Sequence, residues 1–105
     1  MTLAELLNIL KATGYPVAYS HFTTAQMPPY ICILVDGSSN MMADNKVYHK
    51  INDINIELYT IKKDLIAETK IENVLDEHEI SYDSPFETFI ESEKLFQKFY
   101  EVRLI

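Results

Sequence analysis

The chain has 105 residues, which is enough for one domain, so residues 1–105 are taken as a single domain. Nearly half of the residues (48%) are apolar, which is typical of a folded domain with its own core and excludes intrinsic disorder. Nine basic and 16 acidic residues give a net charge of −7, and because such a surface repels phosphate, sequence-specific nucleic-acid binding is not expected.

The first predicted element is a helix over residues 3–13. Thr2 and Glu5 have the spacing of a capping box, in which each side chain satisfies an unpaired backbone N–H at the helix start. Gly14 is suited to the position just after a helix, and Pro16 cannot continue one. An apolar stripe at helical spacing is formed by Leu3, Leu6, Leu7 and Leu10.

Extended segments follow this helix. A short strand is predicted over residues 17–20, and then a loop or arm over residues 23–29, which ends in Pro28-Pro29. The continuous apolar run over residues 30–35 predicts a strand buried on both faces. The polar residues after Gly37 predict a loop over residues 37–45 instead of a tight hairpin.

Residues 47–50 and 51–60 are predicted to be extended, because apolar and polar side chains alternate along the second segment. Asp64 then caps a second helix. Its expected buried stripe is Ala67, Ile71, Val74, Leu75 and His78, and the residues expected to face water are Glu68, Glu72, Asp76 and Glu79.

Residues 81–82 come next, and alternation then predicts strands over residues 86–91 and 96–105. The order of the elements is then α-β-β-β-α-β-β. Two helices and several strands of this kind predict a two-layer α+β domain, in which both helices pack on a mostly antiparallel sheet.

The residues that carry chemistry in other proteins are scattered here. His21, His49 and His78 fall in three separate segments, without the spacing of a metal site. The single cysteine, Cys32, lies in an apolar run and is expected to be a buried thiol. Only two glycines are present, so no glycine-rich phosphate loop is expected. We therefore expect no enzymatic activity, no cofactor and no metal.

The acidic residues Glu87, Glu91 and Glu93 are expected on an exposed strand face and not in a catalytic cleft. No apolar run approaches the roughly 20 residues that cross a membrane. No basic segment precedes the first apolar stretch. We expect no membrane partner, and a chain that stays in a reducing cytoplasm until it is assembled into a larger structure.

Three parts of the sequence carry a family pattern. The first is Gly14-Tyr15-Pro16-Val17-Ala18-Tyr19-Ser20-His21-Phe22 with Pro28-Pro29-Tyr30. The second is Ala43-Asp44-Asn45-Lys46-Val47-Tyr48 with Ile56-Glu57-Leu58-Tyr59-Thr60. The third is Tyr82, Thr88-Phe89-Ile90-Glu91-Ser92-Glu93 and Phe99-Tyr100-Glu101-Val102. Together they resemble small tail-completion or tail-terminator proteins of long-tailed bacteriophages and prophages of Gram-positive bacteria.

The resemblance implies an α/β fold whose subunits form a hexameric ring, which caps the growing tail tube and offers a surface to the head connector. The implied partners are further copies of the same chain, tail-tube proteins and head-connector proteins, while DNA passes without specific binding. The implied location is the host cytoplasm during assembly and then the virion, at the head–tail interface.

Seven residues are candidates for contacts with these partners: Met41, Met42, Asp44, Asn45, Lys46, Glu91 and Glu93. Exposed methionines adapt their shape to a partner, although a loop that folds its two methionines back onto the core fits the sequence equally well. The other five candidates lie in the segments that carry the resemblance.

Two other functions remain open. One is a different head–tail joining (connector) protein. The other is a small acidic regulatory or inhibitor module, because residues 71–93 contain eight acidic residues and no Lys or Arg. A small enzyme that uses His49 or His78 is a third and weaker hypothesis.

Overall fold

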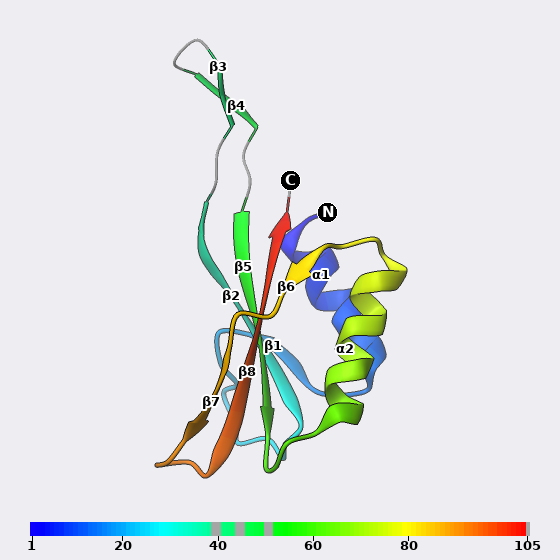
Figure 1. The fold of residues 1–105 in the computed structure, drawn as a ribbon, viewed down its shortest axis with the longest axis vertical. Coiled ribbons are helices and arrows are strands. Elements are labelled where there is room, and N and C mark those ends of the chain that lie inside the picture. The colour runs from blue at the N-terminus through cyan, green and yellow to red at the C-terminus, as the bar shows by residue number, and fades with distance from the viewer. Residues whose placement is uncertain (39–40, 44–45, 50–51, 105) are drawn as a thin grey trace.

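The computed structural model describes residues 1–38, 41–43, 46–49 and 52–104, and for residues 37, 38, 41–43 and 46–49 it describes the main chain alone. Figure 1 shows the arrangement. The elements in chain order are α1 (Leu3–Leu10), the 3-10 helix η1 (Lys11–Thr13), β1 (Val17–Tyr19), β2 (Tyr30–Ser38), β3 (Met41–Ala43), β4 (Lys46–His49), β5 (Asn52–Thr60), α2 (Leu65–Glu77), β6 (Tyr82–Asp83), β7 (Glu87–Ile90) and β8 (Leu95–Leu104).

The first helix begins at the predicted capping box. The Glu5 amide donates to Thr2 Oγ1 at 3.1 Å, and the Thr2 amide donates to Glu5 Oε1 at 3.2 Å. The helix then tightens into η1 and ends at Gly14, whose φ of 85° lies in the left-handed region that favours glycine. The predicted helix over residues 3–13 is therefore present as α1 followed by one 3-10 turn.

The sheet has six strands and is mostly antiparallel, as predicted. Its order is β1-β2-β5-β8-β6, and β7 pairs with β8 beside β6. Only the short β1 runs parallel to its neighbour β2 among these described strands. The register places Cys32 of β2 beside Glu57 of β5, and Glu57 beside Phe99 of β8.

Both helices lie on the same side of the sheet (Figure 1). The core fills the space between them and that face, and its centre is the fully buried ring of Tyr100. The other buried core side chains are Leu6 and Leu10 of α1, Ile31 and Ile33 of β2, Ile54, Ile56 and Leu58 of β5, Ala67, Ile71, Val74 and Leu75 of α2, and Val102 and Leu104 of β8. The two-layer α+β class follows directly from this arrangement.

The prediction of a loop over residues 37–45 is wrong in part. Strand β2 continues to Ser38, and β3 pairs with β4 in a separate two-stranded sheet. The predicted order α-β-β-β-α-β-β therefore has three strands before the second helix and two after it, whereas the described chain has five and three. Strand β3 was missed because three residues are too few to show an alternating pattern. Residues 39–40, 44–45 and 50–51 lie outside the described residues.

The predicted strands after the second helix are present with small shifts of their ends. Residues 81–82 correspond to β6 at Tyr82–Asp83, residues 86–91 to β7 at Glu87–Ile90, and residues 96–105 to β8 at Leu95–Leu104. Strands β6 and β7 pair with different parts of β8, so they form a split edge of the sheet.

The second helix differs from its prediction on one face. Asp64 caps it, since its carboxylate accepts the Ala67 amide at 3.0 Å, and Ala67, Ile71, Val74 and Leu75 are buried as predicted. His78 is exposed, because it follows the last turn and its Nδ1 lies 2.9 Å from the Val74 carbonyl oxygen. Glu68, which was expected to face water, is buried, because two lysines neutralise it there.

Candidate interaction surfaces

The structure places the described residues among the seven predicted contact residues at two opposite ends of the sheet. Met41 and Met42 lie in β3, and Lys46 begins β4, beyond the end of β5 at which Asn52 lies (Figure 1). Asp44 and Asn45 lie outside the described residues. Glu91 and Glu93 lie in the turn between β7 and β8, where Ile90 pairs with Leu95.

The strand register gives the separation of these two ends. Asn52 pairs with Leu104, and Thr60 at the other end of β5 pairs with Phe96 near the β7–β8 turn. Nine residues of extended chain span roughly 27 Å. The structure therefore does not bring the methionine-containing ribbon and the acidic turn into one site.

The acidic residues of the β7–β8 turn do not share a strand face with Glu87, which corrects the prediction. The Glu91 carboxylate pairs with Lys94 Nζ at 2.7 Å, and both side chains are largely exposed. Glu87 lies on β7 and pairs with Lys63 Nζ at 3.1 Å. The sequence alternation failed here because the chain turns at residues 91–94.

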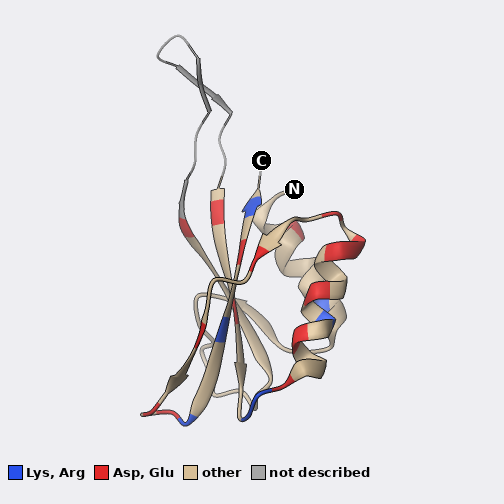
Figure 2. Ribbon diagram, viewed as in Figure 1, with Lys and Arg blue, Asp and Glu red and all other residues tan. Residues whose placement is uncertain are grey.

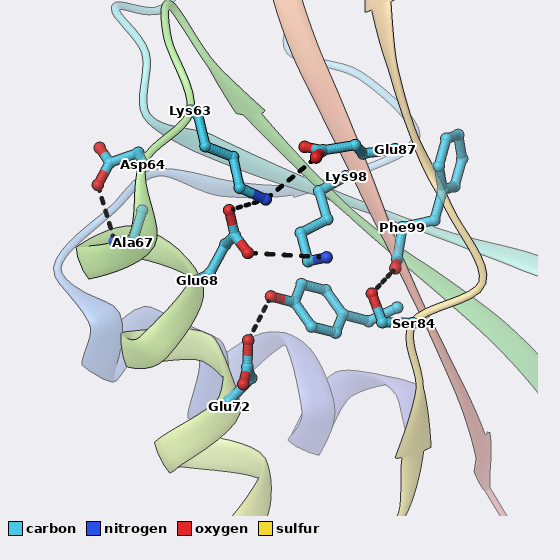
Figure 3. Close-up of polar contacts among 10 residues, drawn as sticks. Lys63, Asp64, Ala67, Glu68, Glu72, Ser84, Glu87, Lys98 and Phe99 are labelled. Atoms are coloured by element: carbon cyan, nitrogen blue, oxygen red, sulfur yellow. Dashed lines mark hydrogen bonds and ion pairs between the residues drawn. The ribbon is translucent and has the colours of Figure 1, made fainter.

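A charge network joins α2 to the sheet on the side of the helices (Figure 3). Glu68 Oε2 lies 2.8 Å from Lys63 Nζ, and Glu68 Oε1 lies 3.6 Å from Lys98 Nζ. The second carboxylate on Lys63 is that of Glu87. Two lysines and two glutamates balance in charge, so this network fastens the first turns of α2 to β7 and β8.

Tyr100 extends this fastening toward the middle of α2. Its hydroxyl donates to Glu72 Oε2 at 2.8 Å, and Lys98 Nζ lies 5.4 Å from the centre of its ring. Burial is the main cause that raises the pKa of Tyr100, and the hydrogen bond to Glu72 raises it further. Glu72 was expected to face water, but it serves as the acceptor of a buried phenol.

The opposite face of the sheet carries a second polar group. Because Ile31, Ile56 and Leu58 point into the core, their strand neighbours point away from the helices. These neighbours include Cys32, which is 3% exposed, and Glu57, which is 7% exposed. The alternating pattern of β5 indicates that Glu57 lies on the face opposite Ile56 and Leu58, but it does not indicate that Glu57 is buried.

Hydrogen bonds connect the residues of this outer face. Gln97 Nε2 donates to the Tyr59 hydroxyl at 2.8 Å, and that hydroxyl donates to Glu57 Oε1 at 3.1 Å. Burial raises the pKa of Glu57 above its usual range. Burial, together with the nearby Glu57 carboxylate, also raises the pKa of Cys32 to about 11.

The arm after β1 encloses a cavity against this outer face. The cavity has a volume of about 350 Å³ and is lined by residues 20–26 of the arm, by Tyr30, Cys32 and Tyr59, and by Glu93. The Tyr30 ring stacks on the Tyr59 ring at 4.9 Å and meets the edge of Phe22 at 5.5 Å. The cavity is therefore bounded by aromatic rings and by the carboxylate of Glu93.

A larger hollow of about 700 Å³ lies at the other end of the sheet and is lined in part by Met1, Tyr82 and Glu101. Two of its lining residues already form an ion pair, with Arg103 Nε 3.3 Å from Asp53 Oδ1. The Asp53 carboxylate in this hollow therefore has a cation from the same chain.

The acidic stretch over residues 71–93 is divided by the fold. Glu72 accepts from Tyr100 of β8, and Glu87 pairs with Lys63 in the segment before α2, whereas Asp76, Glu77, Glu79 and Asp83 are exposed. Figure 2 shows acidic residues along α2 and at the β7–β8 turn. This surface is the most strongly acidic part of the described chain.

Neither described helix is long and apolar enough to cross a membrane. Within the described residues, no group of three or more His, Cys, Asp or Glu side chains is arranged to hold a metal ion. His21 Nδ1 contacts Ser20 Oγ at 3.1 Å, His49 ends β4, and His78 follows α2, so the three histidines are not brought together.

No protein-family model matches this chain, and no curated protein matches it either.

Proposed function

We propose that this chain is a structural protein of bacteriophage or prophage tail completion, a tail terminator that forms a ring between the tail tube and the head connector. The resemblance in sequence supports this proposal. Its matching segments include residues of all eight described strands, both in the six-stranded sheet and in the β3–β4 ribbon. The resemblance thus extends over most of the fold.

The observation that carries the proposal is the two-ended layout of the subunit. The β3–β4 ribbon lies beyond one end of the six-stranded sheet, and the exposed Glu91–Lys94 turn forms the other end (Figure 1). A subunit that joins two partners along one axis needs two separate contact surfaces of this kind. Further contacts between copies require two different patches on each subunit, which is the requirement for a closed ring.

The acidic surface fits the passage of DNA through such a ring. A channel wall with a net negative charge does not hold phosphates, so the duplex moves past without specific binding. Assembly would take place in the host cytoplasm, and the protein would then remain in the virion.

Deletion of the gene in the phage or prophage, followed by electron microscopy of the lysate, tests this proposal. We expect full heads beside tails that are overlong and unattached, and a plasmid copy of the wild-type chain should restore joined particles. Tails of normal length without heads would instead indicate a connector protein. Normal joined particles after deletion would contradict both roles.

A small acidic regulatory module is the second candidate, and the exposed carboxylates of Asp76, Glu77, Glu79 and Asp83 favour it. Light scattering of the purified chain, alone and with tail tubes, separates the two. Ring-sized species that form on tubes support the terminator. A monomer that ignores tubes and binds a basic protein supports the regulatory module.

A further inference from the structure

The cavity between the arm and the outer face of the sheet has walls of a distinctive kind. Phe22 comes from the arm, Tyr30 from β2 and Tyr59 from β5, so three separate segments place aromatic rings around the same space. The rings contact one another edge-to-face and by stacking, which fixes their positions. Aromatic faces of this kind attract cations through the ring quadrupole.

Two carboxylates add negative charge to this space. Glu93 lines the cavity directly. Burial raises the pKa of Tyr30, and the nearby Glu93 carboxylate raises it further. Glu57 lies behind the wall, since Tyr59 donates to it and Cys32 is its neighbour in the register. None of the described residues that line the cavity is Lys or Arg.

Glu57 differs from the other buried carboxylate of the chain. Glu68 has two lysines within 4 Å, and both its oxygens are neutralised. Glu57 is equally buried, yet among the described residues its one polar partner is the neutral Tyr59 hydroxyl. A buried carboxylate without a cation costs free energy unless something outside the chain compensates it.

We propose that this cavity binds the cationic side chain, Lys or Arg, of a partner protein. The guanidinium or ammonium group would lie against the faces of the aromatic rings and be neutralised by Glu93 and Glu57. An anion would meet two carboxylates, and an apolar group would leave Glu57 buried without a counter-charge, so neither fits. A volume of about 350 Å³ exceeds that of one long side chain, which leaves space for water.

The first test uses butylguanidinium as the probe and butylurea as its neutral isostere, with amide chemical shifts of the ¹⁵N-labelled chain as the readout. We expect butylguanidinium to shift amides of residues 20–26, 30–32, 57–59 and 93, and butylurea to shift none of them. Equal binding of the two probes, or no shifts with either, would overturn the proposal.

The second test assigns the charges. Glu93→Gln and Glu57→Gln should each weaken butylguanidinium binding about tenfold, the loss expected for one charge-assisted interaction. Glu101→Gln is the matched control, because Glu101 is exposed on the same face of the sheet, and its affinity should equal that of the wild type. Affinities that are unchanged in both cavity variants would contradict the assignment. Because Glu93 lies in an exposed turn, its variant keeps the test valid should Glu57→Gln fold poorly.

A third readout is the carboxyl ¹³C shift of Glu57 against pH. A bound cation favours the charged form, so the raised pKa of Glu57 should fall when butylguanidinium is present. The other titratable groups that face this region are His21, Tyr30, Cys32, Tyr59 and Glu93. The inference goes beyond the proposed phage role, and gene deletion does not bear on it.

Discussion

Glu68 shows how packing can reverse what a helical pattern predicts for one residue. It lies on a turn of α2 that faces β8, where Lys63 and Lys98 both pair with it. The side chain of Lys98 is only 18% exposed, so it has little water to replace a lost partner. The sequence contains Lys63 five residues earlier, but Lys98 comes from a strand thirty residues later, which no local pattern reveals.

Replacing Glu68 with Ala should therefore destabilise the fold by about 2 kcal/mol, because it leaves Lys98 partly buried and unpaired. Urea unfolding followed by circular dichroism measures the effect. Glu91→Ala is the matched control, since its ion pair with Lys94 is exposed and should contribute less than about 0.5 kcal/mol. Equal losses in the two variants would show that the network does not fasten α2.

Glu57 predicts a dependence of stability on pH. Because burial raises its pKa in the folded state, the folded state binds the proton more tightly than the unfolded state. The stability from this group is present below the unfolded pKa of about 4.3 and is lost as the pH rises through the folded pKa. Glu57→Gln, whose amide oxygen still accepts from Tyr59, should thus be more stable than the wild type at pH 7.

The gain from Glu57→Gln should shrink as the pH falls toward 4, which urea unfolding at several pH values can measure. Glu101→Gln, on the same face but exposed, should show no such trend. A variant less stable than the wild type at pH 7 would mean that the charged form of Glu57 is favoured by the fold.

The thiol of Cys32 is expected to react slowly with labelling reagents in the folded chain. With a pKa of about 11, roughly one thiol in a thousand is ionised at pH 8, and the side chain is 3% exposed. Ellman's reagent should therefore label the folded chain far more slowly than the chain in urea. Rapid labelling of the folded chain would show that the arm opens readily above the thiol.

At the scale of elements, the sequence predicts what depends on local signals. Both helix starts were found from Thr2 and Asp64, because capping uses side chains next to the helix. The extended segment predicted over residues 47–50 corresponds to β4, but β3 was missed, because three residues are too few to show alternation. The outer-face group was missed for a different reason: Tyr30, Glu57 and Gln97 meet only through long-range strand pairing.

The register between β2 and β5 permits a clean removal of the ribbon. Ser38 pairs with Asn52, so an Asn-Gly turn in place of residues 39–51 can close the hairpin directly. We expect this variant to keep the fold, as judged by circular dichroism and thermal unfolding, and to lose the ability to restore joined particles in the deletion lysate.

The control for this variant changes the other end of the molecule. Glu91→Gln combined with Glu93→Gln leaves the ribbon intact and alters the charge of the β7–β8 turn and of the cavity that Glu93 lines. If the variant without the ribbon restores joined particles fully, the ribbon makes no assembly contact. If that variant fails and the double variant restores joined particles, the ribbon makes the assembly contact.

At the scale of the whole molecule, the net negative charge is expected to prevent binding to duplex DNA. With a net charge of −7 and exposed acids along α2, the chain should not retard duplex DNA in a gel, even at low salt, where electrostatic attraction is strongest. Retardation that disappears as salt is added would instead reveal a basic surface that forms only in the assembled state.

Strand β8 lies between β5 and the β6–β7 edge, although it follows all of them along the chain. While the polypeptide emerges from the ribosome, the place of β8 in the sheet stays empty until residues 95–104 have left the ribosome. Until then, the core residues Ile54, Ile56 and Leu58 cannot pack with Tyr100 and Val102. Folding should therefore be completed after synthesis of this strand, and nascent chains stalled before it should remain sensitive to protease.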